Sequence, residues 1–561
     1  MAELERVLLP RPRNDQSMRQ NVYVLYGVGG IGKTQLAVEF TWRHHRRFSS
    51  VFWLDGRSED ILKRSIASCV GRIPQDQIPE TIKRYATDSN VDIDAVVKEV
   101  MTWLAQPNNT TWLLIFDNVD REYTAPGVDP HSYDVRRYLP GADHGSVLVT
   151  TRQAGLGQLG ESQQLGKVSA EQGQAILESW YKRKHDTNQS ALLVMWLDGL
   201  PLAIAQAGAY LQESEVELGE YLWLYDQKWG EVNNLVDVPL RNGSECIVWT
   251  TSAISYETIH DRHKATANLL LLWSFMDNKD LWHGLLAAAC NRSIVAAAML
   301  SRWVGDIASS EVEFNVAMQR LSSYSLVDEV TEITGTKGFT THQLVQQWAY
   351  HSQNEVAKEL SQLAVVAVGW AVPESSTGDY NTLQHRLLPH AKVCFGYMVH
   401  SREDWYIELR RGSHGDIDAD AEREAILVAL HHIRLFYTNQ DNAGAAKQMY
   451  KPQNEPHHKQ LLHSIRRDST PLENPFSKSN MDDDDLIWID TLSGDVAYRP
   501  PYEASATRHS FGSSSNAPRA GHVQLTKAKK PSRVKQLSIE EWPPINSGRH
   551  ISSNQPWPRR H

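Results

Sequence analysis

The chain has 561 residues, of which 41% are hydrophobic and 22% charged, and its formal net charge is −10 at pH 7. This length corresponds to about three or four folding units. The acidic balance gives no overall basic field, so nucleic acid is not an expected partner. Because the sequence has no long apolar run, we expect no membrane partner either.

Cysteine spacing and the N-terminus bear on the compartment. The four cysteines are far apart and form no C-x-x-C pair, which argues against a zinc site and a disulfide framework. The N-terminus has no apolar segment of the kind found in secretory signals. These features predict a cytoplasmic protein.

The first part of the chain alternates strand-like and helix-like segments. Four strands are predicted, at residues 22–26, 51–54, 112–116 and 146–150. Such alternation is typical of an α/β fold, a parallel sheet covered by helices on both faces, in which ligands gather at the carboxyl ends of the strands. We therefore predict a sheet domain at 21–160, preceded by an N-terminal arm at 1–20.

The next two segments are predicted to be separate domains. Residues 161–245 follow a helical pattern, which predicts an all-α domain. Residues 246–353 begin as helices and end in a strand, a turn and a second strand at 326–341. Helices that end in a two-stranded wing are the outline of a winged-helix domain.

The last part of the chain changes in composition. Residues 354–451 are predicted to be helical, and residues 425–450 resemble one tetratricopeptide hairpin, although stacked repeats need several copies. Residues 452–561 are rich in Ser, Pro, Asn and charge, which predicts a disordered tail.

Residues 27–34 read GVGGIGKT and match the phosphate-loop pattern G-x-x-x-x-G-K-[ST]. The loop stands between a predicted strand and a helix, as phosphate binding requires, whereas an accidental glycine turn would need no such context. Lys33 is predicted to reach the β- and γ-phosphates, and Thr34 to bind Mg²⁺. The predicted nucleotide contacts are Gly27, Val28, Gly29, Gly30, Ile31, Gly32, Lys33, Thr34 and Gln35.

Asp117 directly follows the third predicted strand, where a carboxylate would complete the Mg²⁺ site with Thr34. The next residue, Asn118, stands where many NTPases have a second carboxylate that activates water, and an amide cannot accept that proton. This substitution argues against fast turnover. If the chain stays extended, Asp120 faces the same side as Asn118 and is a candidate substitute.

Two further residues are candidate nucleotide contacts. Arg152 ends the fourth strand and is placed to approach the γ-phosphate, while the alternative is a surface arginine. Pro201 follows Gly199, so a left-handed helix end and a proline at the next helix start explain both residues. The proline ring also offers an apolar surface for a purine. The predicted catalytic set is Lys33, Asp117 and Arg152.

Four motifs in order, GVGGIGKT, LLIFDNVD, SVLVTTR and GLPLA, resemble the NB-ARC module of the STAND P-loop NTPases, most closely in the style of fungal NOD-like receptors. The resemblance covers about residues 4–353. It implies that His342, in the winged-helix part, contacts the β-phosphate of ADP, with Gln343 standing where the family has an acidic residue. From the residues alone, Thr341 caps a helix and leaves His342 exposed in its first turn.

The resemblance implies a switch in which bound ADP holds a closed monomer and exchange for ATP opens it for oligomerisation. The implied ligands are ADP or ATP with Mg²⁺, the implied partners are further copies or complete receptors, and the implied enzyme is at most a slow ATPase. The family adds an effector domain and a repeat sensor, which predicts a fragment or a chain that pairs with complete receptors. Two other functions stay open: a rapidly hydrolysing ATPase or kinase with its own substrate, and a transcription regulator that carries the same module.

Overall fold

The computed structural model describes residues 1–10, 20–79, 82, 92–121, 132–233, 243–331, 337–353, 356–373, 380–400 and 417–438. The chain divides into two units, residues 1–451 and 452–561, and all described residues belong to the first. The predicted disordered tail therefore lies outside the described residues, as does the second stretch of the predicted tetratricopeptide hairpin.

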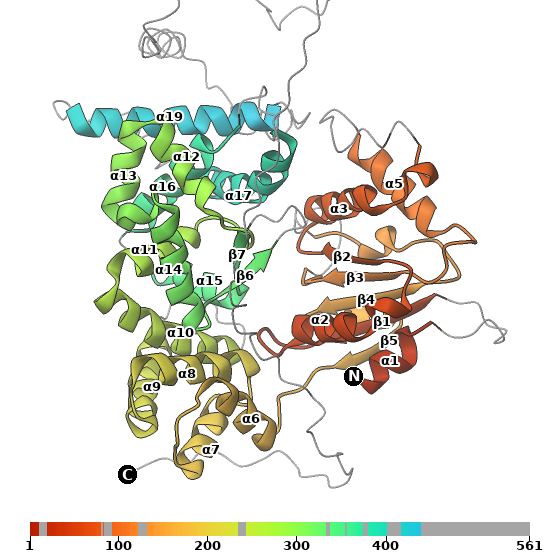
Figure 1. The fold of residues 1–561 in the computed structure, drawn as a ribbon, viewed down its shortest axis with the longest axis horizontal. Coiled ribbons are helices and arrows are strands. Elements are labelled where there is room, and N and C mark those ends of the chain that lie inside the picture. Colours follow the sequence, from red (N-terminus) through yellow and green to blue (C-terminus); the bar gives the residue numbers. More distant parts are fainter. Residues whose placement is uncertain are drawn as a thin grey trace, which may run out of the picture. The chain divides into compact units, whose positions relative to one another are not determined.

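The first layer is a parallel sheet of five strands in the order β2-β3-β4-β1-β5, which Figure 1 shows as a stack of arrows. The strands are β1 (Asn21–Tyr26), β2 (Val51–Asp55), β3 (Leu113–Asp117), β4 (Ser146–Thr151) and β5 (Glu161–Gln164). The four predicted strands are confirmed, with bounds that shift by one residue. The edge strand β5 was not predicted, because its exposed sequence ESQQ has no apolar pattern.

Helices cover both faces of the sheet. They are α1 (Ala2–Leu8) and α2 (Lys33–His44) on one face, and α3 (Glu59–Ser68) and α5 (Ile93–Leu104) on the other. Alternate residues of β1 point to opposite faces, so Leu25 packs in the core with α1 and α2, and Val24 in the core with α3 and α5. Within the predicted N-terminal arm, Leu4 and Leu8 of α1 are buried in this core.

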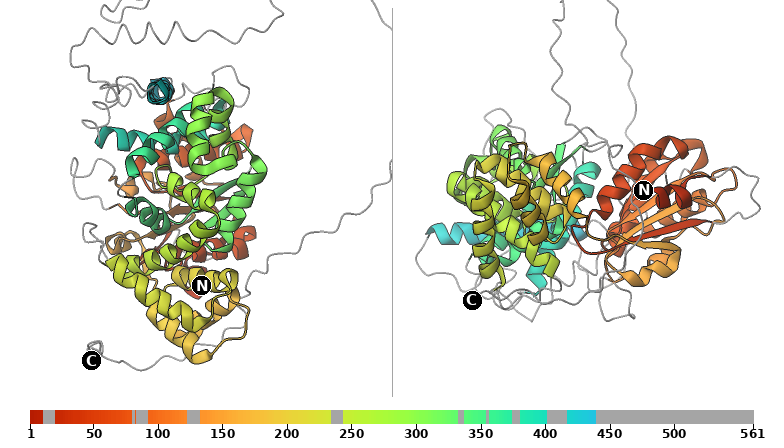
Figure 2. Two further views of the ribbon diagram at one scale, coloured as in Figure 1. Left: turned by 90° about the vertical axis from the view of Figure 1, so that its left-hand side faces the viewer. Right: turned by 90° about the horizontal axis from the view of Figure 1, so that it is seen from below.

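Helices follow the sheet and pack on one another, as the two views of Figure 2 show for the yellow and green segments. They are α6 (Ala170–Trp180), α7 (Thr187–Trp196), α8 (Pro201–Ser214), α9 (Leu218–Asn233), α10 (Gly243–Arg262), α11 (Lys264–Trp273), α12 (His283–Arg292), α13 (Ile294–Val304) and α14 (Glu311–Ser323). Short 3₁₀ turns are η1 (His45–Arg47), η2 (Cys69–Arg72), η3 (Gln75–Gln77), η5 (Val135–Tyr138), η6 (Ala154–Leu159) and η7 (Gly305–Ile307). The predicted domain limits stay predictions.

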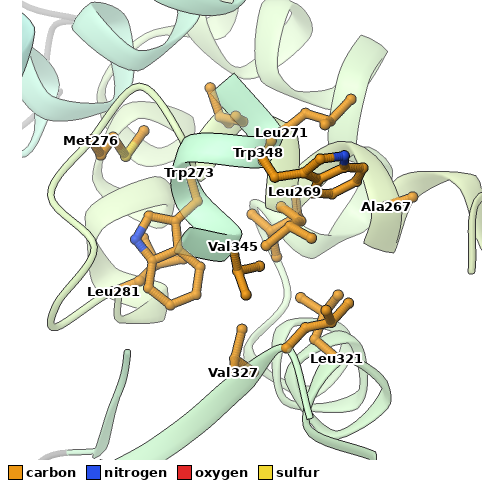
Figure 3. Packing of buried hydrophobic residues seen from close by; sticks show 14 of the residues in the cluster. Ala267, Leu269, Leu271, Trp273, Met276, Leu281, Leu321, Val327, Val345 and Trp348 are labelled. Carbon is orange, nitrogen blue, oxygen red and sulfur yellow. The ribbon is translucent and has the colours of Figure 1, made fainter. Parts of the chain in front are cut away.

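The predicted hairpin is confirmed as β6 (Val327–Thr331) paired antiparallel with β7 (Lys337–Thr341), and α15 (Gln343–His351) follows directly. Figure 3 shows how this region packs: Trp273 of α11, Leu321 of α14, Val327 of β6 and Val345 of α15 meet in one apolar cluster. The core therefore fixes the start of α15 relative to the helices before it.

The described chain ends with α16 (Ala357–Trp370), α17 (Tyr380–His400) and α19 (Ile417–Thr438). Helices α16 and α19 cross very closely at Gly369, where an added Cβ would meet the backbone oxygen of Ala429 at 2.4 Å. Among the described residues, every helix is too short or too polar to span a bilayer.

We expect Gly369→Ala to lower the free energy of unfolding by about 1–3 kcal/mol, because the new methyl group overpacks the crossing of α16 and α19. The same substitution at Gly230 is the matched control. Gly230 lies exposed within α9 with open space around its Cα, so alanine there should raise stability by up to about 1 kcal/mol. Urea unfolding of both variants measures the two effects. A gain in stability in both would contradict the close crossing.

Candidate functional site

The glycine-rich loop connects β1 to α2, as the sequence predicts. Gly30 (φ +75°) and Gly32 (φ +94°) adopt left-handed backbone conformations, which glycine takes without steric cost. Helix α2 begins at Lys33, immediately after the loop, so its positive N-terminal dipole faces the loop. A loop with these two properties is a ready binding site for a phosphate group.

Lys33 is buried against the loop. Its Nζ donates to the carbonyl oxygens of Gly27 (2.9 Å) and Val28 (3.0 Å). Burial lowers the pKa of Lys33 to about 8, while the negative charges of Asp120 and Asp117 act in the opposite direction. At pH 7 the amine is therefore still largely protonated and supplies positive charge inside the loop.

The predicted metal residues lie side by side. The Thr34 hydroxyl donates to Oδ1 of Asp117 at 2.9 Å, and the Thr150 hydroxyl donates to the same oxygen at 2.6 Å. Hydroxyl and carboxylate oxygens suit Mg²⁺, which usually takes a few protein ligands and completes its shell with phosphates and water. No group of three or more His, Cys, Asp or Glu capable of holding a metal occurs in the described ranges. Thr34 and Asp117 thus fit a magnesium ion that arrives with a nucleotide.

The segment after β3 differs from the extended chain assumed for Asp120. Asn118 has a φ of +63°, so the chain turns there, and its Nδ2 donates to Asp117 (3.1 Å). Asp120 instead binds Arg152: Oδ1 accepts from the backbone N–H (2.8 Å) and Oδ2 pairs with Nε (3.1 Å). The prediction that Asp120 faces the same side of an extended chain as Asn118 is therefore wrong.

Arg152 is not a surface arginine. Its Nη2 donates to Oε1 of Gln343 at the start of α15 (3.0 Å), and its Nη1 lies 3.7 Å from Oε1 of Glu245 in α10. The guanidinium also covers the phosphate loop, because a Cβ added at Gly29 would meet its central carbon at 3.2 Å. Arg152 thus touches the loop and three other segments at once.

His342 has a role that the residue pattern assigned to Thr341. His342 is the N-cap of α15 and its Nδ1 accepts from the N–H of Leu344 (3.1 Å), while the Thr341 hydroxyl donates to Leu326. Burial lowers the pKa of His342 to about 3, and the positive charges of Arg152 and Lys33 act in the same direction. The ring is therefore neutral at pH 7. Because Nδ1 accepts, we assign the proton to Nε2, which makes that nitrogen a donor.

The helices after the sheet also contact the loop. The N–H of Leu202 donates to the carbonyl oxygen of Gly30 (3.3 Å), and a Cβ at Gly30 would lie 3.2 Å from Leu202 and 3.7 Å from Val248 of α10. The predicted helix boundary is confirmed, since Gly199 has a φ of +62° and Pro201 opens α8. A purine contact of Pro201 stays a prediction.

A second junction lies at the carboxyl end of β2. Arg57 pairs with Asp55 (2.9 Å) and with Asp277 (3.0 Å), and Lys279 pairs with Asp55 (2.9 Å). Burial alone would raise the pKa of Asp55, but the charges of Lys279 and Arg57 lower it below its ordinary range. These residues were missed from the sequence, as was Glu245, because the junction is completed by pairs between segments more than 90 positions apart and no local pattern marks them.

Comparisons with known proteins agree with the motifs. No family model matches the chain. A nucleotide-binding leucine-rich repeat (NLR)-like protein of Hyaloscypha variabilis is 23% identical over 461 residues, which cover 76% of this chain and 40% of that protein. This chain therefore spans well under two thirds of the length of its relative.

Two solved structures show weak overall likeness. One is a Signal Transduction ATPase with Numerous Domains (STAND) protein with a tetratricopeptide repeat sensor from Pyrococcus horikoshii, at 15% identity and a TM-score of 0.40, over 80% of this chain and 59% of that one. The other is Cdc6p from Pyrobaculum aerophilum, at 10% identity and a TM-score of 0.25, over 64% and 92%. Since TM-scores this low do not establish a common fold, the assignment depends on the sequence relative and on the motifs. On those grounds the predicted resemblance is confirmed at a coarse level: the chain carries a phosphate-loop motif and is similar to an NLR-like protein. Its finer assignment to the NB-ARC module stays a prediction.

Proposed function

We propose that the chain is a molecular switch that binds ADP or ATP with Mg²⁺. One observation carries the proposal: three cationic or N–H-bearing side chains from separate parts of the chain gather around the phosphate loop. Lys33 binds the loop carbonyls, Arg152 covers Gly29, and His342 caps α15, whose Leu344 would lie 3.1 Å from a Cβ at Gly29. A phosphate chain is bound firmly when donors surround it, and the proposed donors come from α2, from the end of β4 and from the residue that caps α15. Hydrolysis alone would not require a contribution from α15.

Each residue has a proposed role in the closed arrangement. Lys33 binds the phosphate oxygens, and Thr34 with Asp117 holds Mg²⁺, which neutralises phosphate charge when bound. His342, neutral and protonated at Nε2, donates to the β-phosphate. Pro201, at the start of α8, supports the purine. The remaining nucleotide contacts are the loop residues Gly27, Val28, Gly29, Gly30, Ile31, Gly32 and Gln35.

Exchange of ADP for ATP is proposed to open the protein. A ligand shifts a conformational equilibrium only if it binds the two states with different affinity. His342 can reach a phosphate on the loop only while α15 lies against the loop, so ADP favours the closed state through this proposed contact. Opening then exposes surfaces for self-association or for assembly with complete receptors, in signalling of the kind found in NOD-like receptors. We place this activity in the cytoplasm.

Slow hydrolysis at most fits the residues around Asp117. Asn118 occupies the place of a water-activating carboxylate, and its amide already donates to Asp117. A rapidly hydrolysing ATPase or kinase would need a base elsewhere, and Asp120 is paired with Arg152. A transcription regulator is the other alternative, and salt-dependent DNA binding in a direct titration would favour it.

We expect Lys33→Ala to weaken ADP binding by about 10- to 100-fold, because the variant loses charge-assisted hydrogen bonds to the phosphates. Titration of the purified chain with fluorescent ADP measures the affinity. Lys98→Ala, at an exposed position of α5, is the matched control and should leave the affinity unchanged. Equal ADP affinity in the Lys33 variant and the control would contradict the proposed site.

We expect the nucleotide-free chain to open more readily as the pH falls from 7 to 5. The closed arrangement holds the pKa of His342 at about 3, well below its ordinary value of 6.5, so a proton is taken up when the site opens. The contribution of His342 to the free energy of closure is therefore fully present above about pH 6.5. It falls by about 1.4 kcal/mol for each pH unit below 6.5, until the pH approaches 3.

The control for this pH effect is His342→Asn, because asparagine keeps the N-cap of α15 but does not titrate. Its radius of gyration without nucleotide, measured by small-angle X-ray scattering, should vary much less between pH 7 and 5 than that of the unaltered chain. The same steep dependence in both proteins would assign the effect to another group.

A further inference from the structure

The guanidinium of Arg152 is held by two carboxylates from different parts of the chain. Asp120, on the segment after β3, pairs with Nε at 3.1 Å, and Glu245, in the first turn of α10, lies 3.7 Å from Nη1. The exposed fractions of the three side chains are 24% for Arg152, 19% for Asp120 and 17% for Glu245. Little solvent therefore screens these charges, and their interactions extend over several ångströms.

The charges near the loop are nearly balanced without a nucleotide. Lys33 and Arg152 supply two positive charges, Asp117, Asp120 and Glu245 supply three negative ones, and His342 is neutral at pH 7. A diphosphate can accept hydrogen bonds from Lys33, from the loop N–H groups and from His342. A third phosphate group needs further positive charge, and Arg152 is already paired with two carboxylates.

We propose that Glu245, acting through Arg152, makes the closed arrangement select ADP over ATP. This inference rests on the proposed switch and names the positioning residue that sets its nucleotide preference. Glu245 pairs with Nη1 and so competes with a γ-phosphate for Arg152. Its negative charge also repels the γ-phosphate. Discrimination by an unfavourable charge is a common way to reject a close analogue.

The position of Glu245 links the nucleotide preference to the opening of the closed arrangement. Asp120 and Arg152 both follow strands of the sheet, so their pair is retained when the helices move away. Glu245 belongs to α10, and Gln343, the other partner of Arg152 from outside the sheet, carries no charge. Separation of α10 from the loop thus releases one carboxylate from Arg152, and the guanidinium gains the capacity to bind a third phosphate.

Glu245→Gln tests the inference, because it removes the charge and keeps the shape of the side chain. We expect the ratio of the dissociation constants for ATP and ADP to fall by about 10-fold, within the range typical of coupling free energies. Most of the change should appear in the ATP constant. Glu257→Gln is the matched control in the same helix, because this glutamate lies more than two helical turns beyond Val248 and pairs with Lys228 of α9, not with Arg152. Its ratio should equal that of the unaltered chain.

Gln343→Glu provides the opposite change, since it adds a third carboxylate beside Arg152. We expect the ratio to rise in this variant. Isothermal titration of the full chain with ADP and with a non-hydrolysable ATP analogue, both with Mg²⁺, measures all ratios, and thermal unfolding checks that each variant is folded. Unshifted ratios in the Glu245 and Gln343 variants, with ADP still bound, would overturn the inference alone. If the unaltered chain binds neither nucleotide, the proposed function fails, and the inference fails with it.

Discussion

The pair between Asp120 and Arg152 is the interaction on which the site depends. One carboxylate binds both the backbone N–H and the guanidinium of Arg152, and so ties the end of β4 to the segment after β3. This double contact directs the guanidinium over Gly29 of the phosphate loop. In that position Arg152 also reaches Glu245 of α10 and Gln343 of α15. A single side chain thereby joins the loop to helices that lie more than 90 residues further along the chain.

A second set of contacts determines where His342 lies. Arg57, at the end of β2, donates to the side-chain oxygen of Asn278 (2.6 Å), and the amide nitrogen of Asn278 donates to the carbonyl oxygen of Thr341 (2.8 Å). The N–H of Thr341 in turn donates to the backbone oxygen of Asn278 (2.9 Å). Because His342 follows Thr341 directly, Asn278 links the edge of the sheet to the residue that caps α15. The ion pair of Arg57 with Asp277 holds this connection in a buried environment, where loss of one partner is costly.

The sequence predicted those parts of the site whose conformation is set by a few consecutive residues. The phosphate loop, the strand ending at Asp117 and the helix break before Pro201 each have a short signature, and all three have the predicted structure. The sequence did not reveal β5, whose polar residues owe their strand conformation to pairing with β1. Nor did it reveal Glu245, Asn278 or the cap formed by His342, since these depend on contacts between distant segments.

The two junctions favour a function in which the protein changes state over one in which it turns over substrate. The side-chain amide of Asn118 donates to Asp117, the proposed metal ligand, and an amide cannot accept a proton from water. His342 is neutral and its Nδ1 is committed to the helix cap, so the ring can donate to a phosphate but is a poor proton acceptor. Arg152 is balanced by carboxylates from two segments, one of which belongs to a helix outside the sheet. In the proposed switch these groups bind phosphate or respond to its charge, and the contacts of Arg152 with Glu245 and Gln343 depend on whether α10 and α15 lie against the loop. The chemistry of the described residues is therefore better suited to sensing which nucleotide is bound than to cleaving it.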